Sequence, residues 1–150
     1  MTEDVAKDKS FEEIEKKQIQ KHEGYREEVY LDTVGVPTGG WGHAFHVGST
    51  LPKHIWENVF TYDFNRFKVE RERLIEEYNL HDLDHVRRLV LIDMLFNLGP
   101  KGVRGFKNTL KYIQEGNYEQ AASNMLKSKW ASQVKSRADI LARQMKTGRL

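Results

Sequence analysis

The 150-residue chain has no cysteine, no long apolar run and no internal repeat. Without cysteine it can form no disulfide framework, thiolate zinc site or thiol nucleophile, which excludes a small secreted protein held together by disulfides. The longest uninterrupted apolar run is residues 89–92, far below the ~18 residues that a membrane-spanning helix needs. The N-terminal residues also lack the apolar core of a signal peptide. We therefore expect synthesis in the cytoplasm and no stable insertion into a membrane.

The composition is that of a folded domain, but its charge is unevenly distributed. Hydrophobic residues make up 39% of the chain and aromatic residues 11%, which argues against disorder because disordered chains are poor in both. The length suffices for one domain with its own hydrophobic core. The formal net charge is only +2, yet residues 101–150 contain 11 Lys and Arg against 3 Asp and Glu. The first 100 residues have a net charge of −6, so the molecule is strongly polarised.

The sequence predicts a helix near the N-terminus. Residues 1–9 are polar, and we expect them to form a flexible extension. Ser10 and Glu13 match the capping-box pattern, in which each side chain satisfies a free amide of the first turn. The pattern predicts a helix that begins at Ser10 and ends near Glu23, because Gly24 is a typical residue after a helix end.

A glycine-rich segment follows and predicts a small antiparallel sheet. Residues 24–48 contain 6 of the 11 glycines. Within this segment, residues 29–31 predict one short strand and residues 36–38 the start of a returning strand. Pro37 favours an edge or irregular strand, because proline has no N–H group to donate to a ladder.

The rest of the chain predicts helices packed around a buried one. A helix should follow Pro52 and run to about Tyr78, and a second should run from near Asp84 to Gly99. The second helix is apolar almost all round, as expected of a helix at the centre of a bundle. Shorter helices are predicted at 106–114, 118–127 and 136–146.

These elements predict an α+β fold with a small sheet lobe and a mainly helical lobe. We expect one domain over residues 10–150, in which residues 10–80 form the N-terminal lobe and residues 81–150 the helical lobe. A cleft between the two lobes is the expected place for a site.

Glu23 and Asp32 are the candidate pair of catalytic carboxyl groups. Cleavage of a glycosidic bond needs one carboxyl group that stays protonated and one that stays ionised. A carboxyl group at a helix C-terminus lies in the negative field of the helix dipole, which favours the protonated form, whereas one in a polar turn keeps its charge. Glu23 and Asp32 match these two environments. Taken alone, the pair fits equally a surface residue and an ordinary turn aspartate.

The surrounding motifs resemble those of the phage-type lysozymes (endolysins), a family of glycoside hydrolases. The motifs are His-Glu-Gly at 22–24, Tyr-x-Asp-Thr-x-Gly at 30–35 and Thr-x-Gly-x-Gly-His at 38–43. The resemblance continues at 86–88, 96–99, 102–106, 108–110, 121–122, 127–130, 137–138 and 146–148. It thus covers residues 14–148 except for about 44–85, where this chain looks shorter than the lysozymes of T-even phages. The resemblance implies a lysozyme-like fold with the cleft between the lobes.

The resemblance implies a muramidase that hydrolyses the β-1,4 bond between N-acetylmuramic acid and N-acetylglucosamine in peptidoglycan. Glu23 resembles the catalytic acid of the family. Asp32 resembles the partner carboxylate, which assists the attacking water, and Thr38 the third catalytic residue, whose hydroxyl holds that water. The family inverts at the anomeric carbon, which predicts carboxyl groups ~6.5–9.5 Å apart.

Six further residues match family positions that bind the sugar chain. They are Ala44, Phe96, Asn97, Thr109, Asn124 and Arg137. Arg137 is also expected to pair with Glu23. The six histidines show no spacing typical of metal ligands, so we expect neither a metal nor another cofactor.

The resemblance also implies how the protein meets its substrate. We expect a monomer that acts on the glycan strands of peptidoglycan in the wall and periplasm after synthesis in the host cytoplasm. Delivery then requires a holin or a phage tail or other injection device. The basic C-terminal third lacks a base-reading module, so we expect no nucleic-acid partner. Two alternatives remain: a catalytically weak wall-binding module, and a lytic transglycosylase, which needs the acid but no water-activating aspartate.

Overall fold

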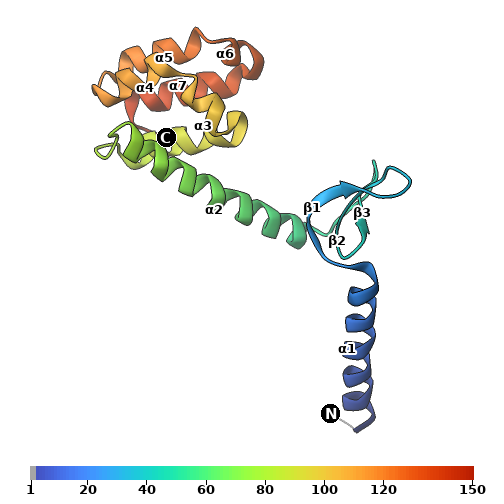
Figure 1. Ribbon diagram of the computed structural model, residues 1–150. Helices are drawn as coiled ribbons and strands as arrows, with labels where there is room; N and C mark the ends of the chain where they lie inside the picture. The colour runs from blue at the N-terminus through green and yellow to red at the C-terminus, as the bar shows by residue number, and fades with distance from the viewer. Residues whose placement is uncertain (1–2) are drawn as a thin grey trace. The chain divides into compact units, whose positions relative to one another are not determined.

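The computed structural model describes the backbone from residue 3 and the side chains from residue 11 to the end of the chain (Figure 1). The described residues form helices and one three-stranded antiparallel sheet, which confirms the predicted α+β class. The chain divides into two compact units, an N-terminal unit up to Pro52 and a helical unit from Lys53 to Leu150. The single domain, the lobe boundary near residue 80 and the cleft between lobes stay predictions.

The N-terminal unit begins with helix α1, Glu3–Glu23. The predicted start at Ser10 is wrong, because Ser10 lies inside the helix and cannot act as its cap. The flexible extension was predicted over residues 1–9. Residues 1–2 lie outside the described residues, and from Glu3 onward the chain is helical. The helix ends as predicted. Gly24 adopts a φ of 71°, and its N–H donates to the carbonyl of Gln20 at 2.9 Å, which closes the last turn.

The sheet contains strands β1 (Arg26–Leu31), β2 (Pro37–Gly40) and β3 (His43–Ala44) in that order. Pro37 therefore opens the central strand, and the edge position expected for it is wrong. Proline is tolerated there because it is the first residue of the strand. Its carbonyl still accepts from the N–H of Phe45 at 2.7 Å. An irregularity that was not predicted lies in β1, where three residues face one residue of β2 between the pairs Arg26–Gly40 and Tyr30–Thr38.

The helical unit is built on helices α2 (Lys53–Glu77) and α3 (His85–Arg104), both close to their predicted positions. Asp84 caps α3, since its side chain accepts from the N–H of Arg87 at 2.9 Å. As predicted, α3 is the buried centre of the unit. Its buried side chains are Val90, Leu91, Ile92, Met94, Leu95 and Val103.

Helix α3 does not stop where the sequence predicts. The backbone leaves the helical conformation at Gly99 (φ 72°, ψ 170°), and the helix resumes at Pro100 and runs to Arg104. Gly99 can adopt this conformation because it has no β-carbon, and Pro100 suits the first turn of the resumed helix. The Gly-Pro pair thus kinks the helix and does not end it.

Four shorter helices complete the unit: α4 (Lys107–Gln114), α5 (Tyr118–Leu126), α6 (Lys129–Val134) and α7 (Ser136–Thr147). Helix α6 was not predicted, although Ser128 caps it by accepting from the N–H of Ala131. No helix in the described part of the chain has the length and apolarity needed to cross a membrane.

Arg87 joins the start of α3 to the end of α7. Its Nε donates to the carbonyl of Met145 at 2.7 Å, and its guanidinium also reaches the carbonyl of Lys146 at 3.1 Å. The guanidinium lies over the ring of Tyr118, 3.6 Å from the centroid. One side chain thus satisfies two of the carbonyls that the end of α7 leaves without helical partners.

Candidate functional site

The end of α1 places the predicted acid, Glu23, against the turn between β2 and β3. The carboxyl group lies beside Gly42 in that turn, and the side chain is exposed. The rings of Tyr25 and Trp41 contact each other with centroids 4.8 Å apart, which ties the chain after α1 to the same turn. The position of Glu23 therefore follows from the helix end and the sheet together.

Asp32 follows β1 and organises the loop that leads to β2. Its Oδ1 accepts from the N–H groups of Val34 at 2.9 Å and Val36 at 2.8 Å. Its backbone also bonds to Val36 and Gly35, so the loop closes around this residue. Among the described residues no hydrogen bond reaches Oδ2. This oxygen is open to a water molecule or a substrate.

Thr38 lies in the centre of the sheet, paired with Tyr30 on one side and Ala44 on the other. Its side chain is only 5% exposed, and its hydroxyl donates to the carbonyl of Val36 at 2.9 Å. Because the hydroxyl proton is used in this bond, Thr38 can hold a water molecule only as an acceptor. The N-terminal unit thus gathers Glu23, Asp32, Thr38 and Ala44 around one sheet, with the two carboxyl groups at opposite ends of β1.

Phe96 and Arg137, two of the predicted sugar-binding residues, line one groove of about 250 Å³ in the helical unit. Phe96 packs against the rings of Phe60 and Phe67 on α2, with centroids 5.6 and 4.8 Å apart. The Nε of Arg137 donates to Asp93 Oδ1 at 2.7 Å. The guanidinium is therefore oriented by α3, and its predicted pairing with Glu23 stays a prediction.

Thr109 and Asn124 form a second group in the helical unit. Thr109 is 1% exposed, and its hydroxyl donates to Asn124 Oδ1 at 2.7 Å. This bond fixes the orientation of the amide and leaves the NH₂ group of Asn124 for another partner. Thr109 thus lies buried behind Asn124, and its predicted contact with the sugar chain stays a prediction.

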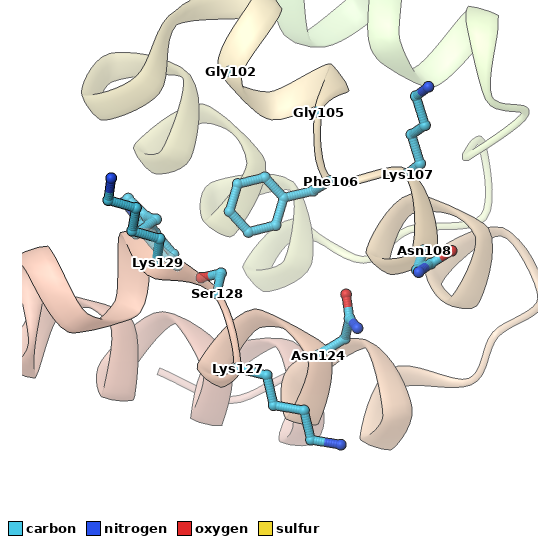
Figure 2. Close-up of a pocket in the computed structure, with 10 residues that line it drawn as sticks. Gly102, Gly105, Phe106, Lys107, Asn108, Asn124, Lys127, Ser128 and Lys129 are labelled. Atoms are coloured by element: carbon cyan, nitrogen blue, oxygen red, sulfur yellow. The ribbon is translucent and has the colours of Figure 1, made fainter.

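Asn124 borders an open groove of about 600 Å³ that sequence reasoning did not single out. Figure 2 shows the amide of Asn124 pointing toward the space beside the ring of Phe106. The hydroxyl of Ser128 is engaged instead with the carbonyl of Met125, to which it donates at 2.6 Å. Trp130 packs edge-on against that ring at 5.7 Å, and its Nε1 donates to Asn97 Oδ1 at 2.6 Å. Asn97 was predicted to bind the sugar chain. Its side-chain oxygen accepts the hydrogen bond that holds Trp130 in the wall of the groove.

Three lysines stand at the rim of this groove and direct their ammonium groups outward (Figure 2). They are Lys107, Lys127 and Lys129. The sequence signal for them was the excess of positive charge after residue 100, which indicated a basic surface but no particular groove. Among the described residues no cluster of three or more histidine or acidic side chains could hold a metal ion.

Comparison with known proteins assigns the family. The family model for phage lysozymes matches residues 20–146. The chain belongs to the phage lysozyme family. The match includes Glu23, Asp32 and Thr38 and extends through both units, and it confirms the predicted membership in this family of lysozymes.

Individual relatives in the phage lysozyme family are distant in sequence. Probable T4-type lysozyme 2 of Dictyostelium discoideum is 28% identical over 163 residues, which cover 90% of this chain and 95% of that protein. Peptidoglycan hydrolase gp36 of Pseudomonas phage phiKMV is 29% identical over 87% of this chain, but the chain spans only 15% of that protein. Pre-baseplate central spike protein Gp5 of Enterobacteria phage T4 is 26% identical over 88% of this chain, which spans 27% of it.

Proposed function

We propose that this protein is a muramidase that hydrolyses the β-1,4 bond between N-acetylmuramic acid and N-acetylglucosamine in peptidoglycan. The observation that carries the proposal is the family match over residues 20–146, which includes Glu23 at the end of α1 beside Gly42 and Asp32 in the loop after β1. The names of the relatives, a peptidoglycan hydrolase and a T4-type lysozyme, support hydrolysis of the cell wall.

In the proposed mechanism, Glu23 protonates the glycosidic oxygen as the bond to the anomeric carbon breaks. Asp32 accepts a proton from the attacking water through Oδ2 and stabilises the positive charge that develops on the sugar. Thr38 orients that water by accepting a hydrogen bond from it. Attack from the face opposite the leaving group inverts the anomeric configuration. Ala44, Phe96, Asn97, Asn124 and Arg137 would bind the glycan, and Thr109 would position Asn124. The mechanism requires no metal or organic cofactor.

The first experiment is clearance of permeabilised Gram-negative cells by purified protein. Wild-type protein should lower the turbidity of the suspension, and Glu23→Gln should abolish this activity because an amide cannot donate the required proton. Thermal unfolding of the variant serves as the control for folding. Lysis by a folded Glu23→Gln variant at the wild-type rate would show that the assigned acid is wrong.

Analysis of the products from defined muropeptides tests the bond and the stereochemistry. A muramidase releases N-acetylmuramic acid at new reducing ends, initially as the inverted α-anomer. Anhydro ends, detected by mass spectrometry, would instead identify a lytic transglycosylase. Sedimentation with purified sacculi without release of reducing ends would identify a wall-binding module. Either result would overturn the proposed reaction.

We further propose that the enzyme acts as a monomer on glycan strands in the wall and periplasm after delivery across the inner membrane. A relative that is a component of the pre-baseplate of a phage supports delivery by a tail device, and a holin pore is the other route. Spheroplast release assays with and without a coexpressed holin would distinguish the two.

A further inference from the structure

We infer that Gly42 is a positioning residue. Because Gly42 has no side chain, the carboxyl group of Glu23 can lie directly against its backbone. The inference rests on the proposed function, in which Glu23 is the acid. Gly42 itself touches no reacting atom. It acts through the space that it leaves for the acid in the turn between β2 and β3.

The contact between the two residues is close. A β-carbon added to Gly42 would come 2.6 Å from Oε2 and 3.2 Å from Cδ of Glu23. Its three nearest neighbours would all belong to Glu23. Any other residue at position 42 must therefore move the carboxyl group, while the rest of the sheet has room for the added carbon.

Other glycines of the N-terminal unit show that the contact is particular to Gly42. Gly24, Gly35, Gly40 and Gly48 also have positive φ, but an added β-carbon at each would meet nothing within 4 Å. Backbone conformation alone accounts for glycine at those positions. At Gly42 (φ 75°) the conformation and the space taken by Glu23 both demand it.

Two contacts hold the end of α1 over this turn, so the carboxyl group cannot avoid an added methyl group by a shift of the whole helix. Arg26 pairs with Gly40 in the sheet, two residues before Gly42. The ring of Tyr25 lies against that of Trp41, next to Gly42. A larger residue at position 42 should therefore displace the exposed carboxyl group of Glu23. This displacement should lower the rate of the chemical step.

The test compares Gly42→Ala with Gly48→Ala on soluble peptidoglycan fragments of defined length. Both glycines have positive φ, so both substitutions strain the backbone, but only the first displaces the acid. We expect Gly42→Ala to lower kcat by about 10- to 100-fold, the loss typical of a misplaced catalytic group. The KM should stay within about twofold of wild type, because the substrate contacts are unchanged. Gly48→Ala should keep the wild-type kcat.

Thermal unfolding separates positioning from folding. Comparable losses in Tm for the two variants, with the loss of kcat confined to position 42, would support the inference. Should Gly42→Ala not fold, Gly42→Asn repeats the test with a residue that tolerates positive φ. A folded variant at position 42 that keeps kcat within about twofold of Gly48→Ala overturns the inference and leaves the proposed function intact. A wild-type protein that releases no reducing ends overturns both.

Discussion

Asp32 uses one carboxylate oxygen, Oδ1, to hold its own loop, and the proposed mechanism assigns the other, Oδ2, to the attacking water. The two hydrogen bonds to Oδ1 come from Val34 and Val36, which connect β1 to β2. The structural role of Asp32 and its proposed catalytic role thus rest on different oxygens of one side chain. The two roles can be separated by substitution, because an amide oxygen accepts hydrogen bonds as a carboxylate does but cannot take up the proton of a water molecule.

We predict that Asp32→Asn keeps the fold and loses the activity. The amide oxygen can still accept from Val34 and Val36, so the free energy of unfolding should fall by less than about 1 kcal/mol. The rate of cell-wall cleavage should fall by about 100-fold or more, the usual contribution of a general base. Urea unfolding and reducing-end assays measure the two effects.

Asp32→Ala is the matched comparison. It removes both hydrogen bonds, so it should lose about 1–3 kcal/mol of stability in addition to the activity. Equal stability of the Asn and Ala variants would contradict a structural role for Oδ1.

The motifs around Glu23, Asp32 and Thr38 name candidate residues for the site, but they do not predict the hydrogen bonds that these residues form. Burial of Thr109 behind Asn124 could not be read from the sequence, because a threonine in a helix has no local signal of the partner that its hydroxyl meets. The positions of Phe106 and Ser128 around the groove depend likewise on the packing of α4 and α6, which are separated in sequence. Contacts of this kind depend on tertiary packing, which the periodicity of the sequence does not predict.

The kink in α3 makes Gly99 the most demanding backbone position of that helix. Its φ of 72° and ψ of 170° lie in a region that is essentially restricted to glycine. An added β-carbon would meet no atom within 4 Å, so the cost of a substitution is purely conformational.

We predict that Gly99→Ala lowers the free energy of unfolding by about 1–3 kcal/mol. Lys101→Ala, at an exposed position two residues later, should change it by less than about 0.5 kcal/mol. Both values can be obtained from urea unfolding. A loss below that of the Lys101 control would show that the kink relaxes in solution.

The start of α3 should make the stability of the protein sensitive to acid. Partial burial raises the pKa of Asp84, but hydrogen bonds from the backbone and side chain of Arg87 and the charge of Arg87 outweigh it and hold the pKa below its ordinary value. A carboxyl group whose pKa is lowered by folding stabilises the folded state above its unfolded pKa of about 3.9. That contribution is lost as the pH falls through the lower pKa of the folded state.

We predict that Asp84→Asn reduces the acid sensitivity of the fold. Asparagine still caps the helix, so the substitution removes mainly the charge. The Tm difference between wild type and variant should be largest near neutral pH and shrink as the pH falls below about 4. Calorimetry from neutral pH to pH 3 provides the measurement. A constant difference over this range would mean that the charge of Asp84 plays no part.

The long helices were predictable because their apolar residues recur with helical spacing over many turns, as in α2 and α3. The boundaries were not equally predictable. Ser10 matches a capping box, which predicts a helix start there. The helix begins at Glu3 instead, because the polar residues before Ser10 are also helical. Gly-Pro usually ends a helix, yet α3 resumes after Gly99, and the resumed part contributes Val103 to the core. Helix α6 has only six residues, too few to show a period.

At the scale of the whole molecule, the excess of positive charge after residue 100 belongs entirely to the helical unit. Its lysines include those at the rim of the 600 Å³ groove. Bacterial walls carry anionic polymers, so this charge should raise the local concentration of enzyme at the substrate. The near-neutral total charge conceals this effect.

We predict that lytic activity falls as salt rises from about 0.01 to 0.15 M, where the Debye length shrinks from ~30 Å to ~8 Å. Replacing both Lys127 and Lys129 by Gln should flatten this dependence. Lys17→Gln serves as the control, because it removes an exposed charge from α1, outside the basic helical unit. Turbidity assays at several salt concentrations give the slopes. If the lytic activity of wild type did not change with salt, the uneven charge distribution would have no role in binding the wall.

The clamp that Arg87 forms on the end of α7 also has a consequence for biosynthesis. Its carbonyl partners lie 58 and 59 positions later in the chain, and α7 contributes buried core residues such as Leu141 and Met145. The ribosome must therefore pass residue 146 before the helical unit can close, and until then its core stays open. We expect ribosome-stalled chains ending after residue 135 to be digested by protease far faster than the full chain.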